Sequence, residues 1–208
     1  MERLAYLIKH RFPALFRLVG WLAERVTTLR YGRRIRRAEE RATLDGEVAG
    51  QPALMRALQG SDVGRLHAFL TALPADHLRY FRPHGFDVTS LRRVLLSRAF
   101  LNYGLFVGED LVGYALLKVA PTGSAFIGLL VHPDFLGKGL GTFITRFLYW
   151  QAAVAGLRAR STICRDNTAS LRSHQAVADY RIVAELPNDY LLIEFPEGPP
   201  KKPRLNSQ

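Results

Sequence analysis

Three glycines at alternate positions are the clearest chemical signal in the sequence. Gly137, Gly139 and Gly141 lie between an apolar segment, 126–132, and a stretch whose large apolar residues have helical spacing. Glycines let consecutive backbone N–H groups converge on one point, and the N-terminus of the following helix adds partial positive charge. Lys138 adds a cation at the same place. The spacing therefore predicts a binding site for a pyrophosphate.

Two better-known phosphate-binding motifs do not fit this turn. The nucleotide P-loop requires Ser or Thr after Gly-Lys, but Gly139 follows Lys138. The dinucleotide pattern Gly-x-Gly-x-x-Gly requires a third glycine where this chain has Thr142 or Ile144. On spacing alone, an ordinary glycine-rich turn remains the alternative.

Over residues 52–195 the sequence resembles the GNAT superfamily of N-acetyltransferases. The pyrophosphate motif of that family is Gln/Arg-x-x-Gly-x-Gly/Ala, preceded by a strand that ends in Val-x-Pro. Residues 129–133 match the strand and residues 136–141 match the turn. Leu136 stands where the family usually has Gln or Arg, so one side-chain contact is missing while the backbone donors remain.

A second motif of the family is an Asn followed by a helix with a Tyr seven residues later and then a Gly-Phe pair. Here Asn167 begins such a stretch, His174 takes the place of the Tyr, and Asp179 and Tyr180 replace the pair with one extra residue. The resemblance implies a general-acid role for His174 toward the leaving thiolate. The alternative is a surface histidine on a helix.

The resemblance also implies direct transfer of an acyl group from acetyl-CoA, or another acyl-CoA, to a primary amine without a covalent enzyme intermediate. The pantetheine arm is expected beside Leu130 and Val131, with the Val131 N–H donating to the thioester oxygen. Asn167 is expected to bind the pantetheine or simply to cap its helix. The cofactor-binding residues expected in full are Leu130, Val131, Gly137, Lys138, Gly139, Leu140, Gly141, Thr142 and Asn167.

The sequence leaves the general base undecided. No Asp or Glu occurs between Leu111 and His132, so the strands beside the glycine turn offer no carboxylate. Cys164 is expected to be a small buried strand residue, since no His stands at a spacing typical of a nucleophile. His132 is expected to be a polar turn residue, with a direct role in the reaction as the alternative. A base could act through water, or be Glu109 in the turn 108–110 or a residue of the loop 75–87, whose part 78–84 covers the acceptor in the layout that the resemblance implies. The loop candidates are Asp76, His77, Tyr80, His84 and Asp87.

The order of elements indicates an α+β fold, a mixed and mostly antiparallel sheet with helices on both faces. This GNAT-like acyltransferase domain is expected over residues 51–196, followed by a mobile tail, 197–208, rich in Pro and Lys. Strands are expected at 54–58, 103–107, 111–119, 125–132, 160–165, 181–186 and 190–195, and helices at 63–73, 88–99, 141–156 and 168–178.

Residues 1–50 are expected to be a basic amphipathic extension and a linker. Apolar residues recur at helical spacing over 1–29, where Pro13 would kink the helix. Residues 1–37 hold ten basic and two acidic side chains, a surplus of eight out of a net charge of +11. This helix is expected to contact an anionic membrane surface or to pack on its own domain or a second subunit as a homodimer. The apolar stripe makes nucleic acid a poor partner, and a transit peptide is a further alternative.

Composition excludes several other classes of protein. Apolar residues make up 48% and charged residues 23%, as in a globular domain. The single cysteine excludes an intrachain disulfide framework and offers no metal site. We expect a cytoplasmic enzyme that acts on a small-molecule or protein amine, with peripheral attachment to the inner face of the membrane as an option. Alternatives are a CoA-binding protein without catalysis and a membrane-peripheral enzyme with a lipid-linked or saccharide acceptor.

Overall fold

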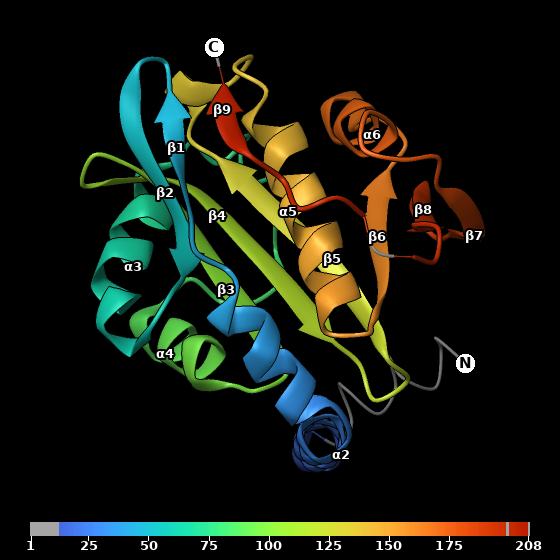
Figure 1. Cartoon of the computed structure of the whole chain (residues 1–208). Coiled ribbons are helices and arrows are strands. Elements are labelled where there is room, and N and C mark those ends of the chain that lie inside the picture. Colours follow the sequence, from blue (N-terminus) through green and yellow to red (C-terminus); the bar gives the residue numbers. More distant parts are fainter. Residues whose placement is uncertain (1–12, 199, 208) are drawn as a thin grey trace.

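A nine-stranded sheet organises residues 13–198 and 200–207, the part of the chain that the computed structural model describes (Figure 1). The strand order is β7-β8-β6-β5-β4-β3-β2-β1-β9, with parallel pairing only between β5 and β6 and between β1 and β9. The strands are β1 Leu44–Val48, β2 Gln51–Ala57, β3 Phe100–Val107, β4 Asp110–Val119, β5 Ser124–Val131, β6 Arg158–Cys164, β7 Arg181–Leu186, β8 Tyr190–Glu194 and β9 Leu205–Ser207.

Helices cover both faces of this sheet. They are α2 Pro13–Glu40, α3 Val63–Ala72, α4 Val88–Leu96, α5 Leu140–Val154 and α6 Thr168–Gln175, with short 3-10 turns at Gly60–Asp62 and Pro133–Phe135. Leu105 and Val107 of β3 pack in the core shared with α2 and α5, whereas Phe106 between them packs with α3 and α4. Because both faces are covered, the central strands are apolar almost throughout. The predicted fold class is confirmed.

The parallel pair β5 and β6 separates soon after it begins. Only Ser124–Phe126 pairs with Arg158–Arg160. Beyond that point β5 stays paired with β4 as far as Val131, and β6 stays paired with β8 as far as Cys164. The two strands therefore diverge toward their carboxyl ends and leave an opening in the middle of the sheet.

The expectation that residues 1–50 end in a linker is wrong. Helix α2 continues to Glu40, and β1 begins at Leu44 and joins the sheet. Tyr31, Ile35 and Ala38 are buried against the core at spacings of four and three residues. The arginines between them lie on the outer side of the helix. Because these arginines dominate the segment, its short apolar pattern was not recognised in the sequence. Pro13, the expected site of a kink, is the first described residue, and the predicted helix before it lies outside the described residues.

The expectation of a mobile tail is also wrong. Strand β9 pairs in parallel with β1, and Leu205 is buried (Figure 1). The contact requires a glycine on β1, because a Cβ added to Gly46 would lie 1.7 Å from the carbonyl oxygen of Leu205. A three-residue strand after a Pro- and Lys-rich segment carries too little periodicity to be recognised in the sequence.

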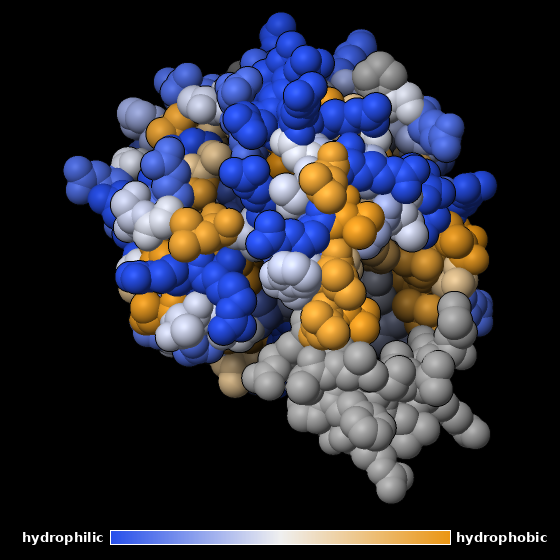
Figure 2. Space-filling model, turned by 90° about the horizontal axis from the view of Figure 1, so that it is seen from below, coloured by the Kyte–Doolittle hydropathy of each residue, from blue (hydrophilic) through white to orange (hydrophobic). Residues whose placement is uncertain are grey.

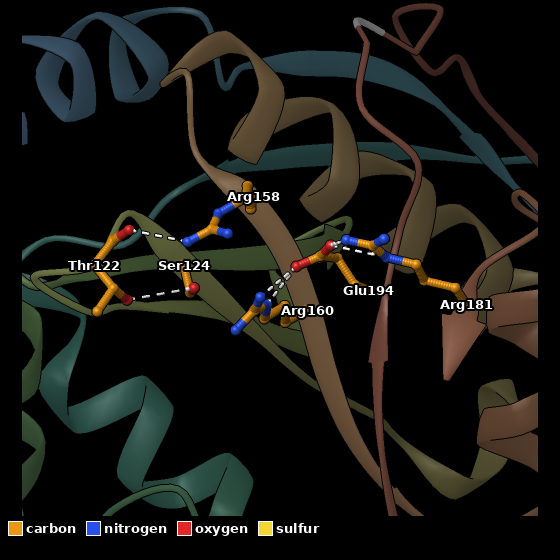
Figure 3. Close-up of polar contacts among 6 residues, drawn as sticks. All are labelled: Thr122, Ser124, Arg158, Arg160, Arg181 and Glu194. Atoms are coloured by element: carbon orange, nitrogen blue, oxygen red, sulfur yellow. Dashed lines mark hydrogen bonds and ion pairs between the residues drawn. The ribbon is translucent and has the colours of Figure 1, made fainter. Parts of the chain in front are cut away.

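At the opposite end of the sheet, a buried carboxylate joins three strands. Glu194 of β8 is 2% exposed and accepts hydrogen bonds from Arg160 of β6 and Arg181 of β7 (Figure 3). Burial alone would raise the pKa of Glu194, but the hydrogen bonds from Arg181 and Arg160 outweigh burial and hold this pKa below its usual value. Glu194 is therefore charged and paired at neutral pH.

Candidate functional site

A cavity of about 740 Å³ opens where β5 and β6 diverge. Its walls are the carboxyl half of β5, the glycine turn, the first turn of α5, the inner side of β6 and helix α6. The loop between α3 and α4 covers one end through Asp76, His77, Tyr80 and Phe81. Segments separated by more than a hundred residues in sequence thus line one cavity.

The glycine turn has the backbone conformation that its composition predicts. Gly137 and Gly139 have φ angles of 76° and 73°, in the left-handed region where other residues are strained. Gly139 is the N-cap of α5, and Gly141 lies in the first turn of that helix. The unpaired N–H groups at this helix start border the cavity, so the turn can bind an anion through its backbone.

Most of the residues expected at the cofactor site surround this cavity. The exception is Lys138, whose Nζ atom lies 4.6 Å from the centre of the Phe135 ring and which does not line the chamber. Those that line it are Leu130, Val131, Gly137, Gly139, Leu140, Gly141, Thr142 and Asn167, together with His174.

The peptide groups of Val131 face the opening between β5 and β6. The N–H of the next residue, His132, donates to the Val112 carbonyl on β4. Because successive residues of a strand direct their peptide groups to opposite edges, the N–H and C=O of Val131 point away from β4. The Val131 N–H is therefore directed to the side on which a ligand strand could be added.

His77 contacts the same residue from the covering loop. Its Nε2 atom lies 2.7 Å from the Val131 carbonyl oxygen. A carbonyl only accepts, so Nε2 carries the proton and donates it, and this assignment leaves the lone pair on Nδ1. Of the candidate bases named from the sequence, His77 is thus held in place with one nitrogen able to accept a proton.

Asp76 and Tyr80 also line the cavity, whereas the remaining candidates for the base have other contacts. Asp87 caps α4 by accepting from the Ser90 N–H. Glu109 and His132 border a separate cavity near α3. The imidazole of His84 lies 2.9 Å from the Tyr114 hydroxyl, and burial lowers the pKa of His84.

His174 is buried rather than at the surface. It is 1% exposed, and its ring stacks on Phe195 with centroids 5.7 Å apart. Burial lowers the pKa of His174 to about 4, although the hydrogen bond to the Ser170 carbonyl opposes that shift. Its Nδ1 lies 2.8 Å from that carbonyl oxygen and must donate to it. At neutral pH the remaining nitrogen, Nε2, has a lone pair and no proton to give.

Asn167 and Cys164 have structural contacts in addition to lining the cavity. The Asn167 side chain accepts from the Ser170 N–H and caps α6. The Cys164 thiol is half-buried, and its hydrogen bond to Asp166 raises its pKa, so that it remains protonated at neutral pH. A nucleophilic role for this thiol has no support.

Sequence reasoning missed several residues of the site. Asp166 accepts from the Arg79 guanidinium at 3.0 Å and so connects the covering loop to the turn after β6. Ser161, Thr162, Ser173 and Tyr190 also line the cavity. The sequence offers little signal for these four, since Ser161 and Thr162 interrupt the apolar-polar alternation of β6 and the other two lie on α6 and β8. The loop contact joins residues 87 positions apart and leaves no local pattern. Among the described residues there is no cluster suited to a metal ion and no helix of the length and apolarity that a bilayer span requires.

Comparison with known proteins gives one family and many similar folds. The sequence profile of the family described as "Acetyltransferase (GNAT) family" matches residues 65–179, more than half of the chain. The GNAT domain of PAT from S. lividans has a TM-score of 0.65 at 15% identity, covering 74% of this chain and 97% of that one. No curated protein sequence matches significantly.

Two similar structures were determined with coenzyme A derivatives. RimJ from Mycobacterium smegmatis, in complex with CoA-disulfide, has a TM-score of 0.58 at 19% identity, covering 74% of this chain and 86% of that one. AAC(6')-Ib, in complex with paromomycin and acetyl-CoA, has a TM-score of 0.55 at 18% identity, covering 68% and 91%. At these identities the likeness concerns the fold.

Proposed function

The chain belongs to the acetyltransferase (GNAT) family, and on that premise we propose that it transfers an acyl group, most simply acetyl, from acyl-CoA to a primary amine by direct attack in a ternary complex. The observation that supports this most is that the glycine turn and the divergent strands open into one cavity. The structures of RimJ with CoA-disulfide and of AAC(6')-Ib with acetyl-CoA support a coenzyme A thioester as the donor.

On the donor side, the backbone of Gly137, Gly139 and Gly141 binds the pyrophosphate. The pantetheine arm lies along Leu129–Val131 as an added strand in the opening beside β5. The Val131 N–H then donates to the thioester oxygen, on which negative charge develops as the amine nitrogen attacks the carbonyl carbon. This attack forms a tetrahedral intermediate. When the intermediate collapses, its C–S bond breaks and coenzyme A leaves as the thiolate.

The attacking amine must first lose a proton, and we assign that step to the Nδ1 atom of His77. The geometry supports this assignment because Nε2–H is held by the Val131 carbonyl and leaves Nδ1 as the acceptor. Base and oxyanion donor are thereby attached to one strand residue. Acid–base assistance of this kind contributes roughly 10²- to 10⁴-fold in rate.

For His174 the geometry supports a role other than the general acid that the resemblance implies. Its neutral ring donates from Nδ1 to Ser170, so it holds no proton for the thiolate at neutral pH. We propose that it supports α6 through its contact with Phe195 and that water protonates the thiolate.

The acceptor enters under the loop that carries Asp76, His77 and Tyr80. These polar groups suit a cationic amine, either a small molecule or an amine of a protein. AAC(6')-Ib binds paromomycin in a similar fold, and this observation favours a small polyamine-like acceptor as the first to be tested.

The deciding experiment is a screen of amine acceptors with acetyl-CoA in which release of free thiol is followed. Turnover with at least one amine supports the proposal. Tight binding of acetyl-CoA in calorimetry without turnover on any amine class would instead identify a CoA-binding protein that lacks catalysis. No binding of acetyl-CoA at all would overturn the proposal entirely.

A further inference from the structure

One face of α2 is apolar and exposed. Leu18, Leu22, Val26 and Leu29 follow one another at spacings of four, four and three residues, which places them on a single side of the helix. They form what we call the apolar stripe, and all are exposed, Leu29 by 87%. The stripe lies opposite the buried face of α2. Its apolar side chains therefore do not serve the core, and the expectation that they pack on the domain is wrong for this part of the helix.

The stripe is surrounded by positive charge. Arg33, Arg36 and Arg37 continue the same side of α2 toward its C-terminus, and all three are exposed. Arg25 lies over the ring of the exposed Trp21, 4.9 Å from its centre. Figure 2 views the molecule from the side of α2 and shows an elongated hydrophobic patch bordered by hydrophilic side chains.

Helix α2 also carries three acidic residues, of which Glu39 is half-buried and Glu40 is exposed at the last position of the helix. Glu24 accepts a hydrogen bond from the Ser97 hydroxyl at 2.6 Å and is thereby turned toward the domain. The outward side of α2 thus presents apolar and basic groups together.

A second feature lies beside α2. A cavity of about 280 Å³ is lined by Arg30 and Arg34 of α2, by Arg158 of β6, and by Tyr31, Thr122, Gly123 and Gly156. We call it the arginine pocket. Arg158 donates to the Thr122 carbonyl at 3.1 Å, which orients its guanidinium beside the turn before β5 (Figure 3). Among the described residues, none of its three arginines forms an ion pair with a carboxylate.

The pocket is fitted closely to the helix. A Cβ at Gly123 would lie 2.7 Å from the Tyr31 hydroxyl, and one at Gly156 would lie 3.2 Å from a guanidinium nitrogen of Arg34. Glycines at these two positions let the turns approach α2 and leave the three cations around one hollow. Convergent guanidinium groups without acidic partners are suited to a phosphate.

We infer that α2 and the arginine pocket form a docking surface for an anionic lipid bilayer. The apolar stripe enters the boundary between headgroups and acyl chains, as in helices that lie in the membrane plane. The pocket lies on the flank of the same helix, at the level where lipid phosphates are found, and takes one of those phosphates. The surrounding arginines contact neighbouring headgroups.

Charge favours this occupant over a second copy of the chain. A two-fold dimer brings the same patch of both subunits together. The exposed arginines that border the stripe would then be gathered from both subunits into one interface, where like charges repel. An anionic bilayer satisfies the stripe and the arginines at once.

The test uses the full-length protein, because deleting residues 1–40 would remove Tyr31, Ile35 and Ala38 from the core. Sedimentation is measured with vesicles of phosphatidylcholine alone and of an equimolar mixture with phosphatidylglycerol. We expect binding to the mixture only, weakened by added salt, which screens exposed charges. If the native protein ignores the mixed vesicles, the inference is overturned.

Two double variants separate the two features. Leu22→Gln with Leu29→Gln removes the stripe, and Arg34→Gln with Arg158→Gln removes charge from the pocket. Each arginine near an anionic surface strengthens binding roughly fivefold, so the pocket variant is expected to lose on the order of twentyfold. The matched control is Leu96→Gln with Arg92→Gln, an exposed apolar and a basic residue of α4. It must bind vesicles like the native protein.

Melting curves first establish that each variant is folded. Unaltered vesicle binding by both double variants would refute the docking surface. Light scattering provides another outcome: a native dimer that the stripe variant converts to monomer would identify a self-interface instead. Soluble glycerol phosphate is a further probe. If it binds the native pocket in calorimetry while the pocket variant still binds vesicles normally, the pocket takes a free phosphate and not a lipid.

Discussion

The Nε2 atom of His77 lies 2.7 Å from the carbonyl oxygen of Val131, although 54 positions separate the two residues in sequence. The same strand residue directs its N–H into the opening between β5 and β6. The N–H of Val131 and the imidazole of His77 therefore lie at the same edge of β5.

His77→Gln tests the proton acceptor. The glutamine amide can still donate to the Val131 carbonyl but has no basic nitrogen, so the loop stays in place while the proton acceptor is lost. We expect kcat to fall by roughly 10²- to 10⁴-fold with acetyl-CoA affinity unchanged. Steady-state kinetics and calorimetry measure the two quantities. A glutamine variant as active as the native enzyme would return the base to another group or to water.

Gly141→Val tests the pyrophosphate site. An added Cβ at Gly141 meets nothing closer than the Ser173 Cβ at 3.9 Å, so the protein is expected to fold. The branched side chain would obstruct the phosphates at the start of α5 and abolish acetyl-CoA binding in calorimetry. Gly64→Val is the matched control, since Gly64 occupies the same position in the first turn of α3 with nothing within 4 Å. Unchanged affinity in folded Gly141→Val would contradict the donor site.

His174 predicts a dependence of stability on pH. Its pKa is about 4 in the folded chain against an ordinary value of 6.5, so the unfolded chain binds more protons between these values. Stability contributed by the neutral ring is complete above pH 6.5 and falls as the pH drops toward 4, by about 3 kcal/mol in all. His174→Asn keeps a donor to Ser170 but does not titrate. Urea unfolding between pH 4 and 6.5 should show that the free energy of unfolding depends less on pH in the variant than in the native protein. An equal dependence on pH in both proteins would refute the lowered pKa of His174.

Glu194→Gln tests the buried carboxylate that joins β6, β7 and β8. Removing its charge leaves Arg160 without its partner, and breaking a buried pair in this way destabilises a protein by about 3 kcal/mol. Glu185→Gln is the control, because its pair with Arg165 is exposed and contributes little. Urea unfolding measures both. Equal free energies of unfolding for the two variants would show that Glu194 adds no stability.

Local patterns made the centre of the molecule predictable. The glycine turn, the strands around it and the helix after it are each indicated by spacing within a few residues, and α5 begins within one residue of its predicted start. Long-range contacts left no such pattern. The bond from His77 to Val131, the burial of His174 against Phe195 and the pairing of β9 with β1 depend on segments brought together only by the fold. In α2, the few buried positions could not be predicted from the sequence, because most residues around them are arginines.

Strand β9 also affects which backbone groups are exposed at one edge of the sheet. The outermost strand of a sheet presents unpaired N–H and C=O groups that can recruit a strand from another chain. By pairing with Gly46–Val48, the strand Leu205–Ser207 shields most of that row on β1. A chain truncated before Leu205 would leave β1 open to edge-to-edge association. A tag fused after Gln208 would be attached next to β9 and could disturb its pairing with β1.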